Sequence, residues 1–187
     1  PIGNIQMKKT PVINLMLTNL LLFCCVGVAN ANAPFKKVAQ CESDFFNGSF
    51  CSKKNLTFYK NVLKAQKANF NQKYILINTG DSDSLELIAL DTKTGIAYPL
   101  NYQFTGWEDN QGKVLKKPSV QFSLNTPKLC LSGSQYDGEH PGTHETYSNI
   151  RQCFEIKTDR NFTGFESDYS DRIQYQYLEQ NKSWMPY

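Results

Sequence analysis

The chain has 187 residues, with 20 Lys or Arg against 17 Asp or Glu, and its formal net charge is only +3. A balance this close to neutral argues against a nucleic-acid-binding protein, which normally carries a basic stripe or patch. The length is that of one domain with a sizeable hydrophobic core.

The N-terminal residues have the layout of a secretory signal peptide. A basic start at Met7–Lys9 is followed by a leucine-rich apolar run and then by the small residues VANANA. The apolar run is short for a membrane span, which needs ~20 residues. We predict cleavage after Ala31. Ala33 is the alternative, but a cut there would leave Pro34 at the cleaved bond.

A lipoprotein is the alternative interpretation of this segment, with Cys24 or Cys25 as the lipidated residue. Phe23 is bulky for the usual lipid-attachment pattern, so we favour cleavage. Residues 1–31 are then upstream sequence and signal peptide, and residues 32–187 form a single domain. Loss of two lysines leaves 18 basic residues (20 − 2) against 17 acidic ones. The sequence thus predicts an exported protein, periplasmic or secreted, without a transmembrane segment in the mature chain.

Four cysteines remain after removal of the signal peptide, and an even number in an exported chain predicts disulfides. Four cysteines allow three connectivities. We predict Cys41–Cys51, which closes a short loop, and Cys130–Cys153, which joins two adjacent strands around a long polar loop. The spacing lacks the CxxC pairs of a thiolate metal site.

A helix is predicted from Lys53 to Lys67, with Ser52 as its N-cap. Apolar residues recur there at helical spacing and most lysines fall between them, which is typical of an amphipathic helix covering one face of a sheet. A lysine-rich helix lying on a membrane surface is the alternative. The residues of the predicted apolar face are Leu56, Tyr59, Val62, Leu63 and Phe70.

The centre of the fold is predicted between residues 73 and 100, where three apolar runs alternate with two turns. The runs are Tyr74–Ile77, Leu85–Leu90 and Ile96–Leu100. Apolar residues on both faces of the first two runs indicate strands buried from both sides. Gly95 supplies the positive φ that a tight hairpin with a bulge requires.

The remainder of the chain is predicted to add strands joined in order by turns. Residues 102–118 and 137–149 are expected to be polar loops. Further strands are expected at 120–124, 129–132, 150–156, 162–165 and 173–178. The predicted fold class is α+β, mainly β: an antiparallel meander with one N-terminal amphipathic helix packed on it and two disulfides.

Three segments resemble a family of uncharacterised exported bacterial proteins. They read NFNQKYILINTG, LELIALDTKTGIAYPL and VQFSLNTPKLCLSG, and the resemblance extends from Asn69 to Phe154. The family pattern contains an apolar-Asp-x-Lys-Thr-Gly-x-x-Tyr-x-Leu hairpin, which Leu90–Leu100 matches. The chain departs from the pattern at Asn71–Tyr74, where the family has Gly-His-Tyr. The resemblance implies export and a β fold but no established activity.

The most chemically suggestive segment is the polar stretch at 137–145. It contains His140 and His144, the only two histidines of the chain, together with three carboxylates. Imidazole and carboxylate groups together suit zinc or another divalent metal. Pro141-Gly142 prevents a helix that would place both histidines on one side, so an ordinary hydrophilic loop is the favoured interpretation.

Two other motifs are better explained as turns. Lys93-Thr94-Gly95 matches one element of the penicillin-recognising serine enzymes, but the accompanying Ser-x-x-Lys is missing. Asp81 and Asp83, followed by Glu86, have alternate spacing as in calcium loops, but the third alternate carboxylate and internal glycine are absent. We therefore assign no catalytic, cofactor-binding or metal-ligating residue, and we expect no cofactor.

Two functions from different classes remain. The favoured one is a non-enzymatic exported binding protein, of the inhibitor or immunity type, with an envelope or secreted protein as its partner and no nucleic acid. The alternative is a metal-dependent hydrolase that uses the 137–145 loop. The sequence does not distinguish the first from a purely structural module.

Overall fold

A computed structural model describes residues 31–39, 41, 50–137, 146–160 and 162–187. Residues 31–187 form one compact unit. One α-helix is present in this described part, α1 (Lys53–Ala65), with a short 3-10 helix, η1 (Tyr169–Asp171). The strands are β1 (Lys37–Val38), β2 (Tyr74–Asn78), β3 (Leu85–Asp91), β4 (Ile96–Thr105), β5 (Trp107–Glu108), β6 (Val114–Lys116), β7 (Ser119–Gln121), β8 (Leu129–Asp137), β9 (Thr146–Thr158), β10 (Thr163–Ser167), β11 (Ile173–Leu178) and β12 (Ser183–Pro186).

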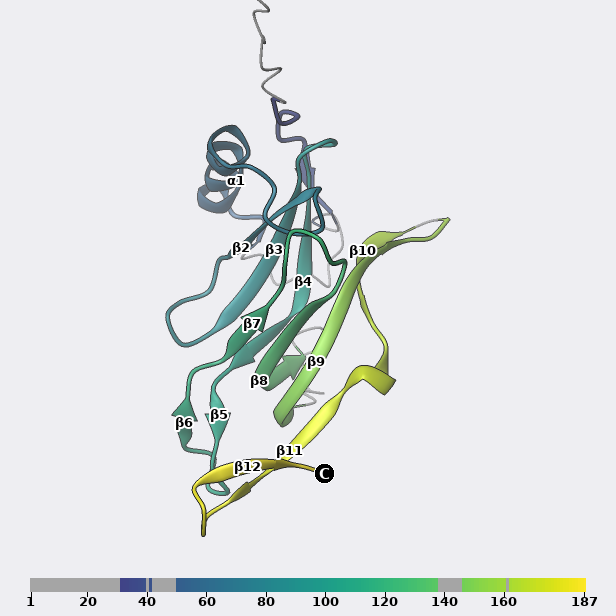
Figure 1. The fold of residues 1–187 in the computed structure, drawn as a ribbon. Helices are drawn as coiled ribbons and strands as arrows, with labels where there is room; N and C mark the ends of the chain where they lie inside the picture. Colours follow the sequence, from purple (N-terminus) through teal and green to yellow (C-terminus); the bar gives the residue numbers. More distant parts are fainter. Residues whose placement is uncertain (1–30, 40, 42–49, 138–145, 161) are drawn as a thin grey trace, which may run out of the picture. The chain divides into compact units, whose positions relative to one another are not determined.

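The main sheet has the order β12-β11-β9-β8-β4-β3-β2, with β7 beside β8 and β10 beside β9 (Figure 1). These pairings are antiparallel, and β5 and β6 form a separate antiparallel pair. The predicted antiparallel meander with one helix and two disulfides is therefore confirmed. β1 departs from the pattern because it pairs with β4 in parallel.

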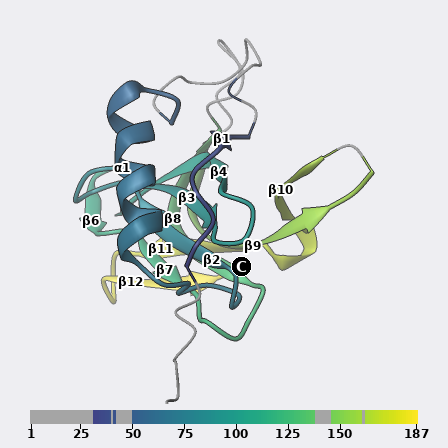
Figure 2. The same cartoon turned by 90° about the horizontal axis from the view of Figure 1, so that it is seen from above.

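The central strands are buried on both faces, as predicted. Side chains alternate along each strand, so Ile88 and Leu90 join the cluster that contains α1, whereas Leu87 and Ala89 join the cluster on the opposite face. Figure 2 shows α1 on one side of the strands. Each of these four residues is at most 2% exposed. At about 25 cal/mol per Å² of buried apolar surface, these two cores supply the main favourable term in folding.

Helix α1 is two residues shorter than predicted. Ser52 caps it, with its Oγ accepting a hydrogen bond from the Asn55 backbone N–H at 3.2 Å. Tyr59, Val62 and Leu63 are buried against the sheet, which confirms the predicted role as a cover. Phe70 was wrongly assigned to this apolar face, because it lies beyond the helix and is buried in the cluster on the opposite face of the sheet. Its lysines are exposed. Within the described residues no helix is long and apolar enough to cross a membrane.

The turn after β3 joins the sheet to the N-terminal segment. The Asp91 carboxylate is fully buried; Oδ1 accepts hydrogen bonds from the backbone N–H groups of Lys93 and Thr94, and Oδ2 pairs with Lys73 Nζ at 2.8 Å. Gly95 has φ +73°, and a Cβ there would clash with the Pro34 carbonyl oxygen. Lys93-Thr94-Gly95 is thus a turn, as predicted.

The predicted loop at 102–118 is wrong. β4 continues to Thr105 because Phe104 is fully buried, and the following residues form the β5–β6 hairpin. Polar residues dominate this stretch in sequence. The strands β5 and β6 could not be recognised from apolar periodicity, because they lie at the periphery and Trp107 is the only buried residue of the pair.

The predicted strand at 120–124 is shorter than expected. β7 pairs with β8 only as far as Gln121, and Phe122 and Leu124 are 39% and 44% exposed. The chain leaves the sheet here because the Ser123 and Leu124 carbonyls accept hydrogen bonds from the turn at Asn71 and Gln72. Strands β8 and β9 are longer than predicted, and β9 occupies 146–149 of the predicted loop. β11 matches its predicted range, and β12 was not predicted.

Substituting Asp91 tests the buried ion pair. Burial alone would raise the Asp91 pKa, but hydrogen bonds from Lys73 and the two turn amides outweigh it and hold the pKa below its usual value. A depressed folded-state pKa gives stability that is present above the unfolded-state pKa of about 3.9 and lost as the pH falls through the folded-state value. We expect Asp91→Asn to lower the free energy of unfolding by about 2 kcal/mol at pH 7, and the deficit to shrink below about pH 4.

Urea denaturation between pH 2 and pH 7 measures this difference. Asp83→Asn is the matched control, because the Asp83–Lys117 pair has side chains 72% and 68% exposed and an exposed pair contributes less than ~1 kcal/mol. An Asp91→Asn deficit that does not change with pH would contradict the assigned role.

Candidate functional site

The β5–β6 and β11–β12 hairpins lie near one another (Figure 1), and aromatic side chains of the two hairpins are in contact. The ring centroid of Trp107 lies 5.2 Å from Tyr175 and 5.3 Å from Trp184, with interplanar angles of 73° and 62°. Tyr177 extends the cluster, with its centroid 5.1 Å from that of Trp184. Edge-to-face arrangements of this kind add ≈0.5–1.5 kcal/mol per pair beyond the burial of area. The cluster therefore holds together two hairpins that share no strand pairing.

The turn of the β5–β6 hairpin is built by Asp109. Its Oδ1 accepts hydrogen bonds from the backbone N–H groups of Gln111 and Lys113, both at 2.9 Å. Gly112 has φ +80°, which suits the turn. Local polar groups thus close the hairpin, and the side chain of Trp107 is the buried contact that anchors it.

A buried asparagine joins the β5–β6 hairpin to the main sheet. Asn149 lies where β9 has one residue more than β8 between Gly133 and Gln135, so it occupies a β-bulge with φ +54°. Its Oδ1 accepts from the Glu108 backbone N–H at 2.7 Å, and its Nδ2 donates to the Glu108 carbonyl at 2.8 Å. The same carbonyl accepts a hydrogen bond from Trp184 Nε1 at 3.3 Å. Asn149 thereby positions both tryptophans.

A groove of about 350 Å³ opens between the two hairpins. Its lining residues combine aromatic rings, hydroxyls and lysines: Trp107, Lys116, Ser132, Tyr175, Lys182, Ser183 and Trp184. Lys116 holds its ammonium 5.5 Å from the centre of the Trp107 ring, within the range of a cation–π contact. Ring faces next to hydrogen-bonding groups and positive charge suit recognition of a small, partly apolar anionic group.

Two features of the groove cost free energy. The indole N–H of Trp107 is buried and has no hydrogen-bond acceptor among the residues that the structure describes, an arrangement that ordinarily costs about 1–3 kcal/mol. Lys182 has φ +47°, in the left-handed region that lysine adopts at a cost of roughly 1–2 kcal/mol. Unfavourable local features of this kind concentrate at functional sites.

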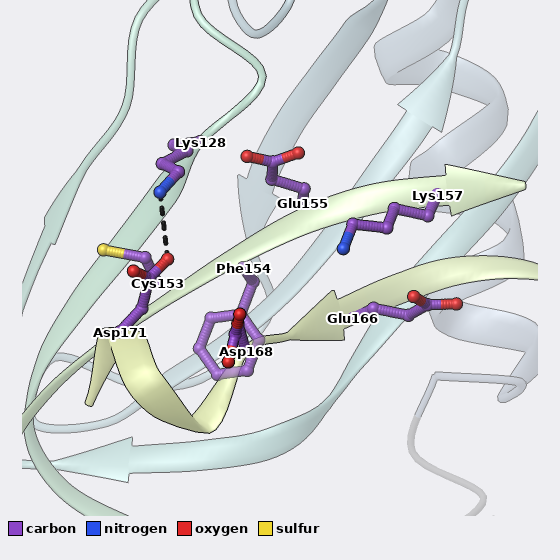
Figure 3. Close-up of a pocket in the computed structure, with 8 residues that line it drawn as sticks. All are labelled: Lys128, Cys153, Phe154, Glu155, Lys157, Glu166, Asp168 and Asp171. Atoms are coloured by element: carbon purple, nitrogen blue, oxygen red, sulfur yellow. Dashed lines mark hydrogen bonds and ion pairs between the residues drawn. The ribbon is translucent and has the colours of Figure 1, made fainter.

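A second hollow, of about 190 Å³, is lined mainly by charged side chains (Figure 3). Lys128 pairs with Asp171 at 2.9 Å on one side of it, and the Cys130–Cys153 disulfide contributes Cys153 to its wall. Glu155 and Glu166 are direct cross-strand partners on β9 and β10. Carboxylates directly opposite each other repel, so this pairing costs some stability.

Hydrogen bonds account for the pKa shifts of Asp168 and Lys128 in the charged hollow. The hydrogen bond from the Ser170 backbone N–H lowers the pKa of Asp168, and the hydrogen bond to Asp171 raises the pKa of Lys128. Both groups are exposed to solvent, which screens their interactions. The hollow is therefore explained as a solvated ion-pair surface.

Both predicted disulfides are present. Cys41 pairs with Cys51, and Cys130 pairs with Cys153. Cys130 and Cys153 are directly opposite each other on β8 and β9, so the bond links neighbouring strands as expected. Neither disulfide touches the aromatic groove, but the second fixes the strand pair from which Asn149 projects.

The carboxylates considered as calcium ligands, Asp81, Asp83 and Glu86, hydrogen-bond or pair with other groups of the protein. Asp81 accepts hydrogen bonds from the Asp83 N–H and the Ser84 hydroxyl, and Asp83 pairs with Lys117. Glu86 accepts from Gln103. Among the residues that the structure describes, no group of His, Cys, Asp or Glu is arranged to hold a metal.

The two histidines of the hydrolase alternative, His140 and His144, lie outside the described residues, so that hypothesis remains a prediction.

No pattern in the sequence predicted the groove. The one feature that could have indicated it is that both tryptophans of the chain, Trp107 and Trp184, fall in polar, turn-rich segments. Comparison of the chain with protein-family models, with curated proteins and with solved structures found no match.

Substitution of Asn149 tests how the groove is held. Asn149→Gly keeps the left-handed backbone and removes both side-chain hydrogen bonds, so we expect the free energy of unfolding to fall by about 2 kcal/mol. The near-ultraviolet circular dichroism of the tryptophans should also weaken. Asn149→Ala should cost roughly 1 kcal/mol more because alanine strains at positive φ. Asn61→Ala, on the exposed face of α1, is the control. Unchanged tryptophan signals in Asn149→Gly would contradict the positioning role.

Proposed function

We propose that this protein is an exported, disulfide-stabilised binding protein that recognises its partner through the aromatic groove and has no catalytic step of its own. The observation that carries the proposal is the groove itself, where Trp107, Tyr175 and Trp184 meet Lys116 and Lys182 in a hollow of about 350 Å³. That volume lies at the lower end of the range of small-ligand sites, ≈300–1,000 Å³. Tryptophan and tyrosine are among the residue types that dominate recognition surfaces.

Export is supported by the signal-like N-terminus, by the resemblance to exported bacterial proteins and by the two disulfides. Disulfides persist in oxidising compartments such as the periplasm or the extracellular space. Each disulfide stabilises a domain by typically ~2–4 kcal/mol. A binding surface carried by short peripheral hairpins benefits from this stiffening, because a preorganised site loses less entropy when it binds.

Mass spectrometry of the protein secreted by its native host tests export. We expect a chain that begins at Asn32, with a mass lower than that of the reduced chain by two hydrogens for each of the Cys41–Cys51 and Cys130–Cys153 disulfides. A chain that retains the leucine-rich segment, or free thiols in the native protein, would contradict export through a cleaved signal.

A binding screen tests the groove as the recognition surface. The purified mature protein is titrated with panels of oligosaccharides, peptides and oligonucleotides, and binding is followed by calorimetry. We expect one class to bind and Trp184→Ala to weaken that binding by roughly thirtyfold or more, the effect of losing a binding hot spot of about 2 kcal/mol.

The matched control for this screen is Phe58→Ala, which removes an aromatic side chain that is 43% exposed on α1. It should bind as the wild type does. Thermal unfolding of both variants verifies that they are folded. Binding that survives unchanged in folded Trp184→Ala, or no binding from any class, would overturn the proposed function.

A further inference from the structure

We propose that the ligand of the aromatic groove is an anionic carbohydrate, a pyranose unit that carries a carboxylate; this inference rests on the proposed binding function. The groove combines three kinds of group that such a sugar needs in one place. Tyr175 and Trp184 are only partly buried, so they present ring surface to the groove. Ser132 and Ser183 offer hydroxyls, and Lys116 and Lys182 offer charge.

The sugar ring accounts for the aromatic groups and the hydroxyls together. A pyranose has an apolar C–H face, which packs against an aromatic ring, and a rim of hydroxyls, which both donate and accept hydrogen bonds. Serine hydroxyls can pair with that rim in either sense.

The carboxylate accounts for the lysines. Lys116 is held over the Trp107 ring, and Lys182 is exposed at the turn between β11 and β12. Lys182 occupies a left-handed position where Asn or Gly would cost less. Both ammonium groups line the groove, and a ligand carboxylate is the complementary group.

Other anionic ligands fit the groove less well. A nucleic acid would need a longer basic stripe, whereas the predicted mature chain has 18 basic and 17 acidic residues, and the groove is lined by two lysines. A peptide made only of acidic residues would use the lysines but has no ring to cover the indoles. A proline-rich peptide would use the rings but would leave both lysines without a partner.

Tryptophan fluorescence of the mature protein, titrated with tetragalacturonate, tests the ligand class. Its methyl ester is the matched neutral probe, because it keeps the sugar rings and removes the charge. We expect the acid to bind and the ester to bind at least roughly tenfold more weakly, since hydrogen bonds to charged groups are the stronger ones. Added salt should weaken binding of the acid more than that of the ester.

Three variants locate the charge. Lys182→Asn keeps a residue that tolerates the left-handed turn and removes the ammonium, so it should weaken binding of the acid roughly tenfold while leaving thermal stability equal or higher. Lys116→Gln should also weaken it. Lys157→Gln, at the charged hollow, is the control and should not.

Three outcomes overturn the sugar assignment. If the acid and the ester bind equally well, or if Lys182→Asn binds the acid as the wild type does, the ligand is not recognised through a carboxylate. Tighter binding of a poly-glutamate peptide or of oligothymidylate, lost in Trp184→Ala, replaces the carbohydrate with another class and leaves the binding function intact. Binding of none of these three probes overturns the sugar assignment, whereas the proposed function falls only if every class in the binding screen also fails to bind.

Discussion

The structure depends on strands that are buried from both sides. In β3 the side chains of Leu87 and Ala89 enter one core and those of Ile88 and Leu90 enter the other. A slip of one residue would exchange these sets, and each core would receive side chains of the wrong shape. Register is therefore fixed by packing. The Asp91 turn, with its buried ion pair to Lys73, fixes it again where the chain reverses into β4.

The groove depends on this core indirectly. The β5–β6 hairpin is a separate two-stranded sheet, and two-stranded hairpins are marginally stable in isolation. The bulge at Asn149 ties this hairpin to β9, because one buried amide bonds to both backbone groups of Glu108, whereas β11 pairs with β9 directly. The core thus sets the position of the groove, while the charge and shape of the groove are set by the side chains of the peripheral hairpins.

The sequence predicted what local periodicity determines. The apolar runs of β2 and β3, the amphipathic face of α1 and the turn at Gly95 each follow from residues close together in the chain. The groove does not, because Trp184 bonds to Glu108 across 76 residues of sequence. Asn149 appeared as the last residue of a polar loop, and its role arises only from the extra residue of β9. Periodicity also failed at 102–118, where β4 extends past the buried Phe104 and the peripheral β5–β6 pair has Trp107 as its one buried side chain.

The groove and the charged hollow differ in the kind of unfavourable feature that each contains. In the hollow, Lys128 and Asp171 pair with each other and Asp168 accepts a hydrogen bond from a local amide, while the cross-strand carboxylates of Glu155 and Glu166 repel each other. In the groove, the buried Trp107 N–H has no acceptor within the described part of the chain and Lys182 holds an unfavourable φ, so both features lower stability. A cost of a few kcal/mol is large beside the ≈5–15 kcal/mol by which a native domain is stable. The Lys182 ammonium is exposed and lines the groove, so a bound anionic group would add a favourable charge interaction at the strained residue.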